Sequence, residues 1–197
     1  MKDVALDACC LINLLAAGCV LPKPGDVEEV SKGAAGASDP SPLGLVLHVP
    51  TVVTDECYYM YQPDPDDPDR LVKTSIDLRP YLTGGILRPC DVEGEAESDL
   101  LANYATRLDD GEASCLAVAK GRGWGLATDD RLAARMAIQE GVAVLTTAEL
   151  VKRWAKRAKA TDAAIAEILT DIRRYAKFVP RASSAEAAWW LAHLPPA

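Results

Sequence analysis

Residues 124–133 read Trp-Gly-Leu-Ala-Thr-Asp-Asp-Arg-Leu-Ala. The run at 124–128 is mostly apolar and indicates a buried strand, and residues 129–140 have the pattern of a helix. Asp129 and Asp130 therefore stand where a strand ends and a helix begins. Aspartate at this place is explained by capping of the helix, or by a ligand at the end of the strand. A strand followed directly by a helix is the unit of a parallel sheet.

The same alternation repeats along the chain and predicts an α/β fold around a mostly parallel sheet. Strands are expected at 4–6, 45–49, 86–92, 124–128 and 142–145. Helices are expected at 8–17, 50–61, 70–82, 93–108, 113–122, 129–140, 146–159, 160–177 and 184–194. In an open parallel sheet, ligands bind beyond the carboxyl ends of the strands, so the residues that follow each strand carry the functional prediction.

Two segments interrupt the alternation. Residues 21–44 are rich in Pro, Gly, Ser and charge, which predicts a long loop insertion. Residues 62–69, Gln-Pro-Asp-Pro-Asp-Asp-Pro-Asp, resemble a calcium loop in composition. Their prolines, and the lack of the loop glycine and terminal glutamate, break the EF-hand spacing, so we expect solvated coil there.

Composition limits the classes of protein to consider. No apolar run approaches the roughly 20 residues that span a bilayer, and charge interrupts the first residues too early for a secretory signal. These features predict a soluble, cytoplasmic protein with no membrane association. The six cysteines are then expected to be reduced thiols packed as small hydrophobes. With only His48 and His193 present, a multi-histidine zinc site is excluded, and any metal ion would be held mostly by oxygen.

The net charge of −8 argues against general affinity for nucleic acid, but the charge is unevenly distributed. Residues 151–181 carry nine Lys or Arg and three acids, a net +6, so the rest of the chain carries −14. The basic segment fits a surface that contacts phosphates. It fits equally well a solvated helix face beside acidic groups from elsewhere in the chain.

Five acids stand at or near positions that a parallel sheet would bring to one edge: Asp7, Glu56, Glu112, Asp129 and Asp130. Each taken alone is explained as a helix cap or a solvated helix residue. If the first and fourth strands are neighbours, however, the acids converge. Several carboxylates in one small pocket repel one another unless a cation is present, and Mg²⁺ and Mn²⁺ prefer such oxygen ligands.

Four segments, in order, resemble the PIN-domain family, and more narrowly its VapC-like branch. They are Val-Ala-Leu-Asp-Ala-Cys-Cys-Leu-Ile-Asn-Leu-Leu, Val-Pro-Thr-Val-Val-Thr-Asp-Glu-Cys, Leu-Asp-Asp-Gly-Glu-Ala-Ser-Cys-Leu-Ala-Val-Ala and Ala-Thr-Asp-Asp-Arg-Leu-Ala-Ala-Arg. The resemblance covers roughly residues 2 to 158. It implies a three-layer α/β/α nuclease domain at 1–158 and extra C-terminal helices at 159–197.

The resemblance also implies roles for individual residues. Asp7, Glu56, Glu112 and Asp130 match the family's four acids and would bind Mg²⁺ or Mn²⁺, with Asp7 and Asp130 as direct ligands. Asp129 is an adjacent candidate, and Asn13 and Thr128 match supporting polar positions. We expect Arg131, Arg135, Lys152 and Arg153 to hold the substrate. The implied activity is metal-dependent hydrolysis of RNA, with an antitoxin protein and a homo-oligomer as further partners if the chain is a toxin.

The leading alternative is a catalytically inactive PIN-like module that binds another protein. Ala8 and Cys9 stand where the family often has a serine or threonine after the first aspartate, so one supporting hydroxyl is missing. Trp189 and Trp190 are either a docking patch or a cover for the chain's own core. An aspartyl phosphatase would need a second aspartate at position 9. Serine or cysteine hydrolases, Rossmann proteins and P-loop proteins lack their motifs here.

Overall fold

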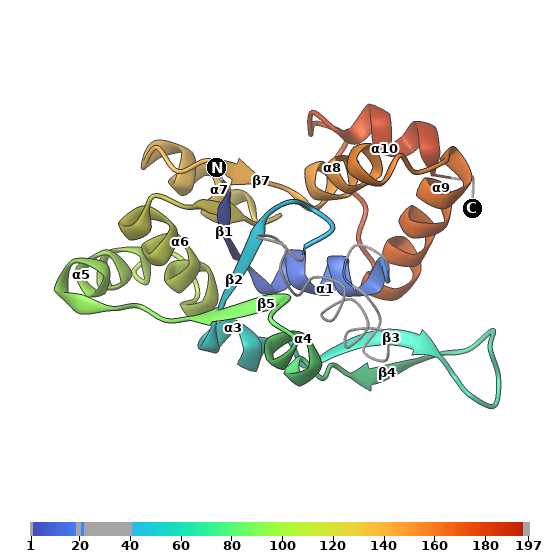
Figure 1. Cartoon of the computed structure of the whole chain (residues 1–197), viewed down its shortest axis with the longest axis horizontal. Helices are drawn as coiled ribbons and strands as arrows, with labels where there is room; N and C mark the ends of the chain where they lie inside the picture. Colours follow the sequence, from blue (N-terminus) through green and yellow to red (C-terminus); the bar gives the residue numbers. More distant parts are fainter. Residues whose placement is uncertain (1, 19–20, 22–40, 195–197) are drawn as a thin grey trace.

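The computed structural model describes residues 2–18, 21 and 41–194 of the 197-residue chain (Figure 1). The expected insertion at 21–44 therefore lies outside the described residues, apart from Leu21 and 41–44. The fold is α/β, as predicted, with a central five-stranded sheet in the order β5-β2-β1-β6-β7. Its strands are β1 (Asp3–Leu6), β2 (Val46–Pro50), β5 (Leu87–Cys90), β6 (Gly125–Ala127) and β7 (Val144–Leu145). Every neighbouring pair is parallel.

The sheet is covered by helices on both faces, which explains why its inner strands are apolar throughout. The helix α6 (Asp110–Arg122) packs on β1, β2 and β6, and α5 (Gly94–Tyr104) packs on α6. The helices α1 (Ala8–Ala16) and α8 (Thr147–Ala158) pack together and lie on the other side of the sheet from α6 (Figure 1). The remaining helix beside the sheet, α7 (Arg131–Gln139), packs against α6 and β7.

The strand order meets the condition on which the predicted convergence of the acids depends. The expected first and fourth strands, β1 and β6, are neighbours, with Leu6 opposite Ala127. The backbone N–H of Asp7 donates a 3.0 Å hydrogen bond to the carbonyl of Ala127, which continues the pairing past the end of both strands. Residues that follow β1 and β6 therefore lie side by side at the carboxyl edge of the sheet.

Helix α6 is buried along residues 113–119 because its residues there are small. Asp109 caps its first turn by accepting a hydrogen bond from the N–H of Glu112, and the helix ends at Gly123, whose φ of 68° lies in the left-handed region that favours glycine. The helix expected at 113–122 is therefore present, but it begins three residues earlier, at Asp110.

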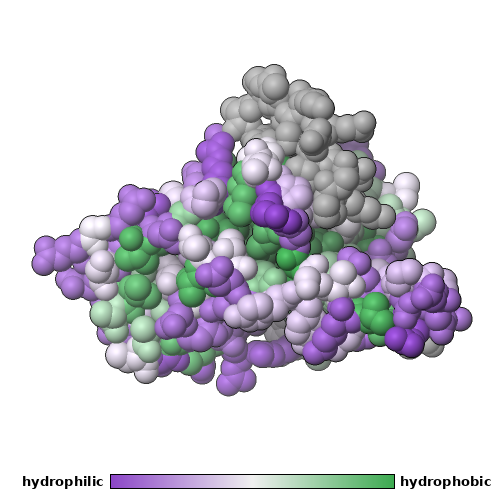
Figure 2. All heavy atoms as spheres, turned by 90° about the horizontal axis from the view of Figure 1, so that it is seen from below, coloured by the Kyte–Doolittle hydropathy of each residue, from purple (hydrophilic) through white to green (hydrophobic). Residues whose placement is uncertain are grey.

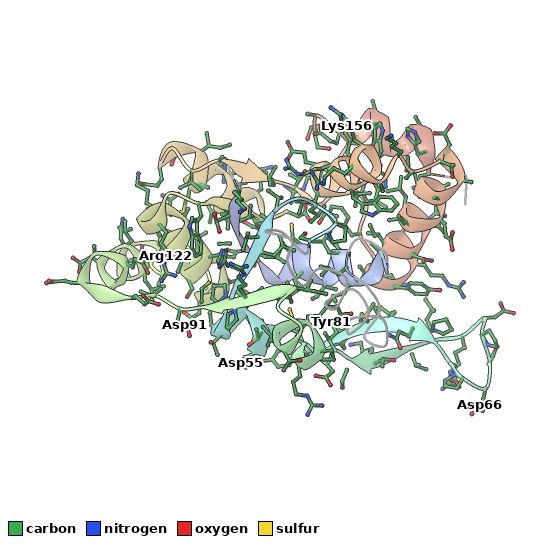
Figure 3. The ribbon with its side chains drawn as sticks, viewed as in Figure 1. Asp55, Asp66, Tyr81, Asp91, Arg122 and Lys156 are labelled. Atoms are coloured by element: carbon green, nitrogen blue, oxygen red, sulfur yellow. The ribbon has the colours of Figure 1, made fainter. Side chains whose placement is uncertain are left out.

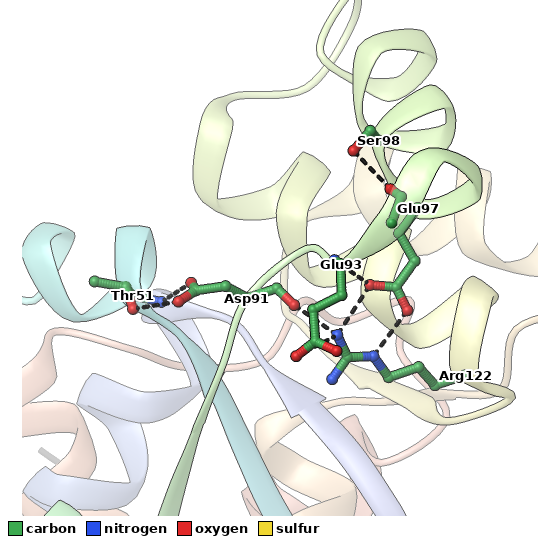
Figure 4. A network of polar contacts seen from close by, with 7 residues as sticks. Thr51, Asp91, Glu93, Glu97, Ser98 and Arg122 are labelled. Atoms are coloured by element: carbon green, nitrogen blue, oxygen red, sulfur yellow. Dashed lines mark hydrogen bonds and ion pairs between the residues drawn. The ribbon is translucent and has the colours of Figure 1, made fainter.

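A polar network joins α6 to α3 (Thr51–Glu56), the helix that carries Glu56. Arg122 makes two hydrogen bonds to the Glu97 carboxylate, at 2.8 and 2.9 Å, and a third to the carbonyl of Asp91 (Figure 4). The Asp91 carboxylate in turn accepts hydrogen bonds from the N–H and hydroxyl of Thr51. This network fixes one end of both helices that contribute acids to the site described below.

The helices expected at 50–61 and 70–82 are present only in part, and the prediction of helix at 57–61 and 70–78 was wrong. Helix α3 stops at Glu56, and β3 (Tyr59–Pro63) pairs antiparallel with β4 (Leu71–Ser75) in a hairpin outside the main sheet. Aromatic residues at 58–61 and the β-branched Val72 and Thr74 favour strands, and this preference overrode the helical pattern. The coil at 62–69 forms the tip of this hairpin, and only the short helix α4 (Arg79–Thr83) follows it.

The C-terminal region is helical, as expected, but is divided differently. The predicted helix 160–177 consists of α9 (Asp162–Asp171) and a π-helical turn, η2 (Ile172–Ala176), which ends at Lys177 with φ 59°. The last helix is α10 (Ala187–His193). Trp190 is fully buried and meets Phe178 edge to face at 5.8 Å, so this tryptophan covers the chain's own core.

Three further observations concern the cysteines, the helices and the surface. In the described part of the chain, five cysteines are free thiols: Cys9, Cys10, Cys57, Cys90 and Cys115. None of the helices in that part is both long and apolar enough to cross a membrane. Figure 2 shows the lower face, where hydrophilic side chains gather at the end that carries the tip of the β3–β4 hairpin.

Candidate functional site

A pocket of about 690 Å³ opens at the carboxyl edge of β1 and β6. It is lined by all five acids expected from the sequence, Asp7, Glu56, Glu112, Asp129 and Asp130, and by Thr128 and Arg131. These residues come from four separate segments of the chain. The segment after η2 also lines the pocket, with Phe178, Val179, Pro180, Arg181, Ser183 and Ser184. The acids therefore converge, as a shared site requires.

Asp7 is the most deeply buried of these acids, with 4% of its surface exposed. It caps α1 by accepting a 2.7 Å hydrogen bond at Oδ1 from the N–H of Ala8. At Oδ2 it accepts two more, each of 2.8 Å, from the thiol of Cys9 and the hydroxyl of Thr128. Burial raises the pKa of Asp7, while these three donors partly offset that effect.

Cys9 supplies a donor at the position where the sequence seemed to lack one. Its Sγ donates to Oδ2 of Asp7, and the N–H of Asp129 donates to the same sulfur at 3.3 Å. A thiol is a weaker donor than a hydroxyl, but it occupies the same place beside the carboxylate. The sequence-based concern about a missing hydroxyl is answered here by a side chain that was treated only as a small hydrophobe.

Glu56, near the end of α3, lies against the start of α6. Its carboxylate is so close to Gly111 that a Cβ at that position would meet both carboxylate oxygens. Burial raises the pKa of Glu56, as do the charges of Asp109 and Asp7, and the backbone N–H of Gly111 acts in the opposite direction. The glycine in the Gly-Glu-Ala sequence therefore makes room for an acid from another segment.

Glu112 has the most strongly perturbed acidity in the pocket. Burial, followed by the charges of Asp109, Asp130 and Asp7, raises the pKa of Glu112 to about 7. Like charges and partial desolvation both disfavour the ionised form. Asp109 was expected only to cap α6. It does so, but it also lines the pocket and adds its charge to the group.

Asp130 and Thr128 connect the end of β6 to Asp7. Oδ1 of Asp130 caps α7 by accepting from the N–H groups of Leu132 at 2.6 Å and Ala133 at 2.9 Å. The N–H of Asp130 donates to the hydroxyl of Thr128, which itself donates to Asp7. Thr128 thus orients one acid directly and holds the backbone of the other, which matches its expected supporting role.

Asp129 is turned toward the protein interior. Its carboxylate accepts from Asn13 Nδ2 at 3.0 Å, from the N–H of Thr147 at 3.0 Å, from the Thr147 hydroxyl and from the Cys10 thiol. Asn13 also donates to the Thr147 hydroxyl at 3.0 Å. Because these donors occupy both oxygens, Asp129 joins α1 to α8 more directly than it faces the pocket.

The ligand atoms of Cys9, Cys10 and Asp129 all lie within 4.8 Å of one another. Metal binding by cysteine requires the thiolate, whereas burial raises the pKa of Cys10 well above its usual value. The two thiols act here as hydrogen-bond donors. This group is therefore better described as support for Asp7 and Asp129 than as a zinc site.

The pocket itself fits a hard cation. Three of its carboxyl groups, those of Asp7, Glu56 and Glu112, have raised pKa values because of burial and mutual repulsion. Oxygen-only donors suit Mg²⁺ or Mn²⁺. Among the described residues, no three of the four family acids have oxygens all within 4.8 Å of one another. In this conformation a single ion would therefore not contact three of these carboxylates directly, and at least some of them would bind it through water.

Most of the expected substrate-binding residues lie elsewhere. Arg131 lines the pocket, whereas Arg135, Lys152 and Arg153 are not among its lining residues. Arg153 donates a 2.6 Å hydrogen bond to the carbonyl of Leu43, and Lys152 lies 3.5 Å from Glu186. The basic segment 151–181 reaches the pocket through Arg181, at its far end, instead.

The sequence analysis missed Asp109 and the segment 178–184 as pocket residues. Both reach the pocket through packing between segments that are far apart in the chain. Asp109 was visible as part of an acidic run, but its place in the pocket depends on how α6 packs. The wall at 178–184 carried no motif. Its only signal was Arg181 at the end of the basic segment.

Comparison with protein families agrees with this geometry. A family model described as a PIN domain, DUF3368, matches residues 49–187, more than half of the chain. The matched region includes Glu56, Glu112 and Asp130, and Asp7 lies before it. Comparison with curated proteins gives no match. PIN domains generally are nucleases. The match covers most of the residues that line the pocket, and the chain belongs to the PIN-domain family.

Proposed function

We propose that this protein is a Mg²⁺- or Mn²⁺-dependent ribonuclease whose active site is the acidic pocket. The observation that carries the proposal is the convergence of Asp7, Glu56, Glu112 and Asp130 on one pocket, where three of them are held with raised pKa values. Perturbed acids in a cleft are typical of functional sites.

The donor set indicates how the ions would be held. Asp7 and Asp130 are the proposed direct ligands, because both line the pocket at the ends of neighbouring strands. Asp7 is held there by the N–H of Ala8 and the hydroxyl of Thr128, and Asp130 by the N–H groups of Leu132 and Ala133. Glu56 and Glu112 are proposed to bind directly or through water. A bound divalent cation would lower the pKa of a water molecule and neutralise charge on the scissile phosphate.

The chain's own residues supply the remaining requirements. Thr128 and Cys9 hold the Asp7 carboxylate in one orientation. Without a cation, burial and the neighbouring acids raise the pKa of Glu112 to about 7, so a bound cation would favour the ionised form that can act as a ligand. Arg131 and Arg181 both line the pocket and are the basic groups proposed to contact phosphates beside the reacting one.

The proposed role as a toxin rests on the resemblance to the VapC-like branch of the PIN-domain family. A toxin role requires a second protein, an antitoxin, that blocks the pocket until it is degraded. The alternative of an inactive, protein-binding module was favoured by the missing hydroxyl after Asp7. The Cys9 thiol donates a hydrogen bond to Asp7 in place of that hydroxyl, which weakens the alternative.

The test is cleavage of a panel of single-stranded and structured RNAs with Mn²⁺, Mg²⁺ or EDTA. We expect wild type to cleave with the cations only, and Asp7→Asn and Asp130→Asn to lose at least 100-fold in rate, as expected for removal of a metal-binding carboxylate. The matched control is Asp55→Asn, which makes the same change at an exposed residue of α3 outside the pocket (Figure 3). Equal rates for wild type and Asp7→Asn would contradict the proposal.

A further inference from the structure

A second pocket, of about 480 Å³, adjoins the acidic one and is lined largely by tyrosines. Glu56 lines both pockets. The backbone also joins them, since residues 176–177 line the second pocket and residues 178–181 the first. We call the second pocket the tyrosine groove; its residues are Ile12, Glu56, Tyr58, Tyr59, Met60, Tyr61, Tyr175, Ala176 and Lys177.

The β3–β4 hairpin holds these rings in place. Tyr59 and Tyr61 are two residues apart in β3 and so project on the same face, where their rings meet edge to face at 6.0 Å. Lys73, opposite Tyr61 in β4, lies 4.0 Å from the centre of the Tyr59 ring. Lys177 lies 4.9 Å from the centre of the Tyr61 ring.

The groove presents aromatic surface that the fold itself does not need. Tyr58 is 71% exposed and Tyr59 is 42% exposed. Large aromatic side chains bury extensive apolar surface when they are used for packing, so two such rings left exposed next to a candidate active site call for a ligand. Among the described residues, the Tyr58 ring packs against no other aromatic ring and no cation.

We propose that the tyrosine groove binds unpaired bases of the RNA whose phosphate lies in the acidic pocket. The inference rests on the proposed function and makes it more specific, since it assigns a base-binding surface beside the acidic pocket. Bases stack on exposed aromatic rings regardless of sequence, because every base has a π-face. Lys73 and Lys177 lie beside the rings, where the phosphates of the same strand would pass.

The charge around the groove limits the path of the strand. The hairpin tip carries Asp64, Asp66, Asp67 and Asp69, and Asp66 is seen at the far end from the sheet (Figure 3). Those carboxylates repel phosphates, so the strand is confined to the base of the hairpin, near Tyr58 and Tyr59. A duplex keeps its bases stacked inside and cannot present their faces to the rings.

A protein segment is the rival occupant, because tyrosines are also common at protein interfaces. Two observations favour nucleic acid. The groove shares Glu56 with the acidic pocket, so a ligand that fills both must carry a phosphate to one and a flat group to the other. The two lysines, moreover, lie over aromatic rings, and neither forms an ion pair with an acid in the described part of the chain.

The test compares binding of two labelled ligands by fluorescence anisotropy, with Ca²⁺ in place of Mn²⁺ to slow hydrolysis. One ligand is a single-stranded adenosine 10-mer RNA, and the other is a ribose-phosphate 10-mer without bases. The variants are Tyr58→Ala and Tyr59→Ala, with Tyr58→Phe and Tyr59→Phe as matched controls that keep the ring. Circular dichroism shows whether each variant is folded.

We expect each alanine variant to bind the RNA about tenfold more weakly than wild type, and each phenylalanine variant to bind it within about twofold. The oligomer without bases should bind all five proteins equally. Unchanged RNA affinity in both alanine variants overturns the proposal and leaves the tyrosines as a surface for a protein.

The two proposals fail separately. If wild type cleaves RNA with Mn²⁺ while both alanine variants keep wild-type affinity, the groove proposal is wrong and the nuclease proposal stands. If wild type cleaves no RNA while the rings still contribute base-dependent affinity, the groove stands as a binding site and the ribonuclease proposal is wrong.

Discussion

The carboxylate of Glu56, at the end of α3, lies directly against the α-carbon of Gly111 in the first turn of α6. No other residue type leaves this space, because a Cβ would overlap both oxygens of the glutamate. The contact joins two acid-bearing helices that are 55 residues apart in the chain, and it gives the glycine of the Gly-Glu-Ala sequence a physical role.

We therefore expect Gly111→Ala to weaken metal binding with little change in the free energy of unfolding. Alanine favours the helix by about 1 kcal/mol over glycine, but it displaces Glu56 from the pocket. The affinity for Mn²⁺, measured by calorimetry, should fall about tenfold while the free energy of unfolding changes little. Gly121→Ala is the matched control: it lies in the same helix and crowds Glu97, which is not among the pocket's lining residues. Equal Mn²⁺ affinity in both variants would show that the Glu56 contact has no role in binding.

The thiol of Cys9 is predicted to act as a donor to Asp7. Cys9→Ser keeps a donor at this position, so its Mn²⁺ affinity should stay within about threefold of wild type. Cys9→Ala removes one hydrogen bond to a charged group and should weaken Mn²⁺ binding about tenfold at pH 7. If both variants bind Mn²⁺ as wild type does, the sulfur only fills space.

The acids of the pocket should make the metal-free protein less stable at alkaline pH. The pKa of Glu112 is about 7 in the folded chain, against 4.5 for the free group, so its stabilising contribution is full below about 4.5 and is lost as the pH rises through about 7. After allowance for solvent screening, we expect a loss of about 1 kcal/mol between pH 5 and pH 8, measured by urea unfolding in EDTA.

Glu112→Gln should reduce this loss, and Mn²⁺ should reverse it, because the cation binds the ionised form of the acids. The raised pKa values of Asp7 and Glu56 act in the same direction, so some pH dependence remains in the variant. A wild-type protein that is equally stable at both pH values in EDTA would rule out strained carboxylates in the pocket.

The ion pair of Arg122 and Glu97 should matter for stability far more than a surface pair of the same geometry. Glu97 is 8% exposed, and Arg122 makes two hydrogen bonds to its carboxylate (Figure 4). Arg122→Ala leaves that charge without its partner and should cost about 2–3 kcal/mol in the free energy of unfolding. Arg79 makes two similar hydrogen bonds to Asp77, but its side chain is 86% exposed, so Arg79→Ala should leave the free energy of unfolding nearly unchanged. Similar costs for both would mean that burial adds nothing to the Arg122 pair.

The parts of the fold that local pattern controls were predictable from the sequence. The apolar strands at 4–6, 45–49 and 124–128, and the helix that starts after Asp109, lie within a few residues of β1, β2, β6 and α6. The prediction failed at 57–82, where a hairpin that packs on η2 replaced two expected helices. The hairpin is stabilised by pairing between its two strands and by packing on η2, and neither contact requires a periodic pattern of apolar residues within one strand.

The candidate site was predictable in its acids but not in their supporting contacts. Asp7 and Asp130 follow strands, and the order of the strands brings them together. The inward orientation of Asp129 depends on Thr147 and Asn13, and the donor to Asp7 depends on Cys9. These contacts join residues across the packed helices, so neither spacing nor residue type along the chain could indicate them.

The most direct test is calorimetric titration with Mn²⁺ of wild type, Asp7→Asn and Asp55→Asn at pH 7.5. Asp55 precedes Glu56 in α3 but is exposed and does not line the pocket, so its substitution controls for the loss of one negative charge. We expect wild type and Asp55→Asn to bind Mn²⁺ with equal affinity and Asp7→Asn to bind it at least tenfold more weakly. Equal binding by all three proteins, or no binding by wild type, would contradict the claim that the converging acids form one cation site.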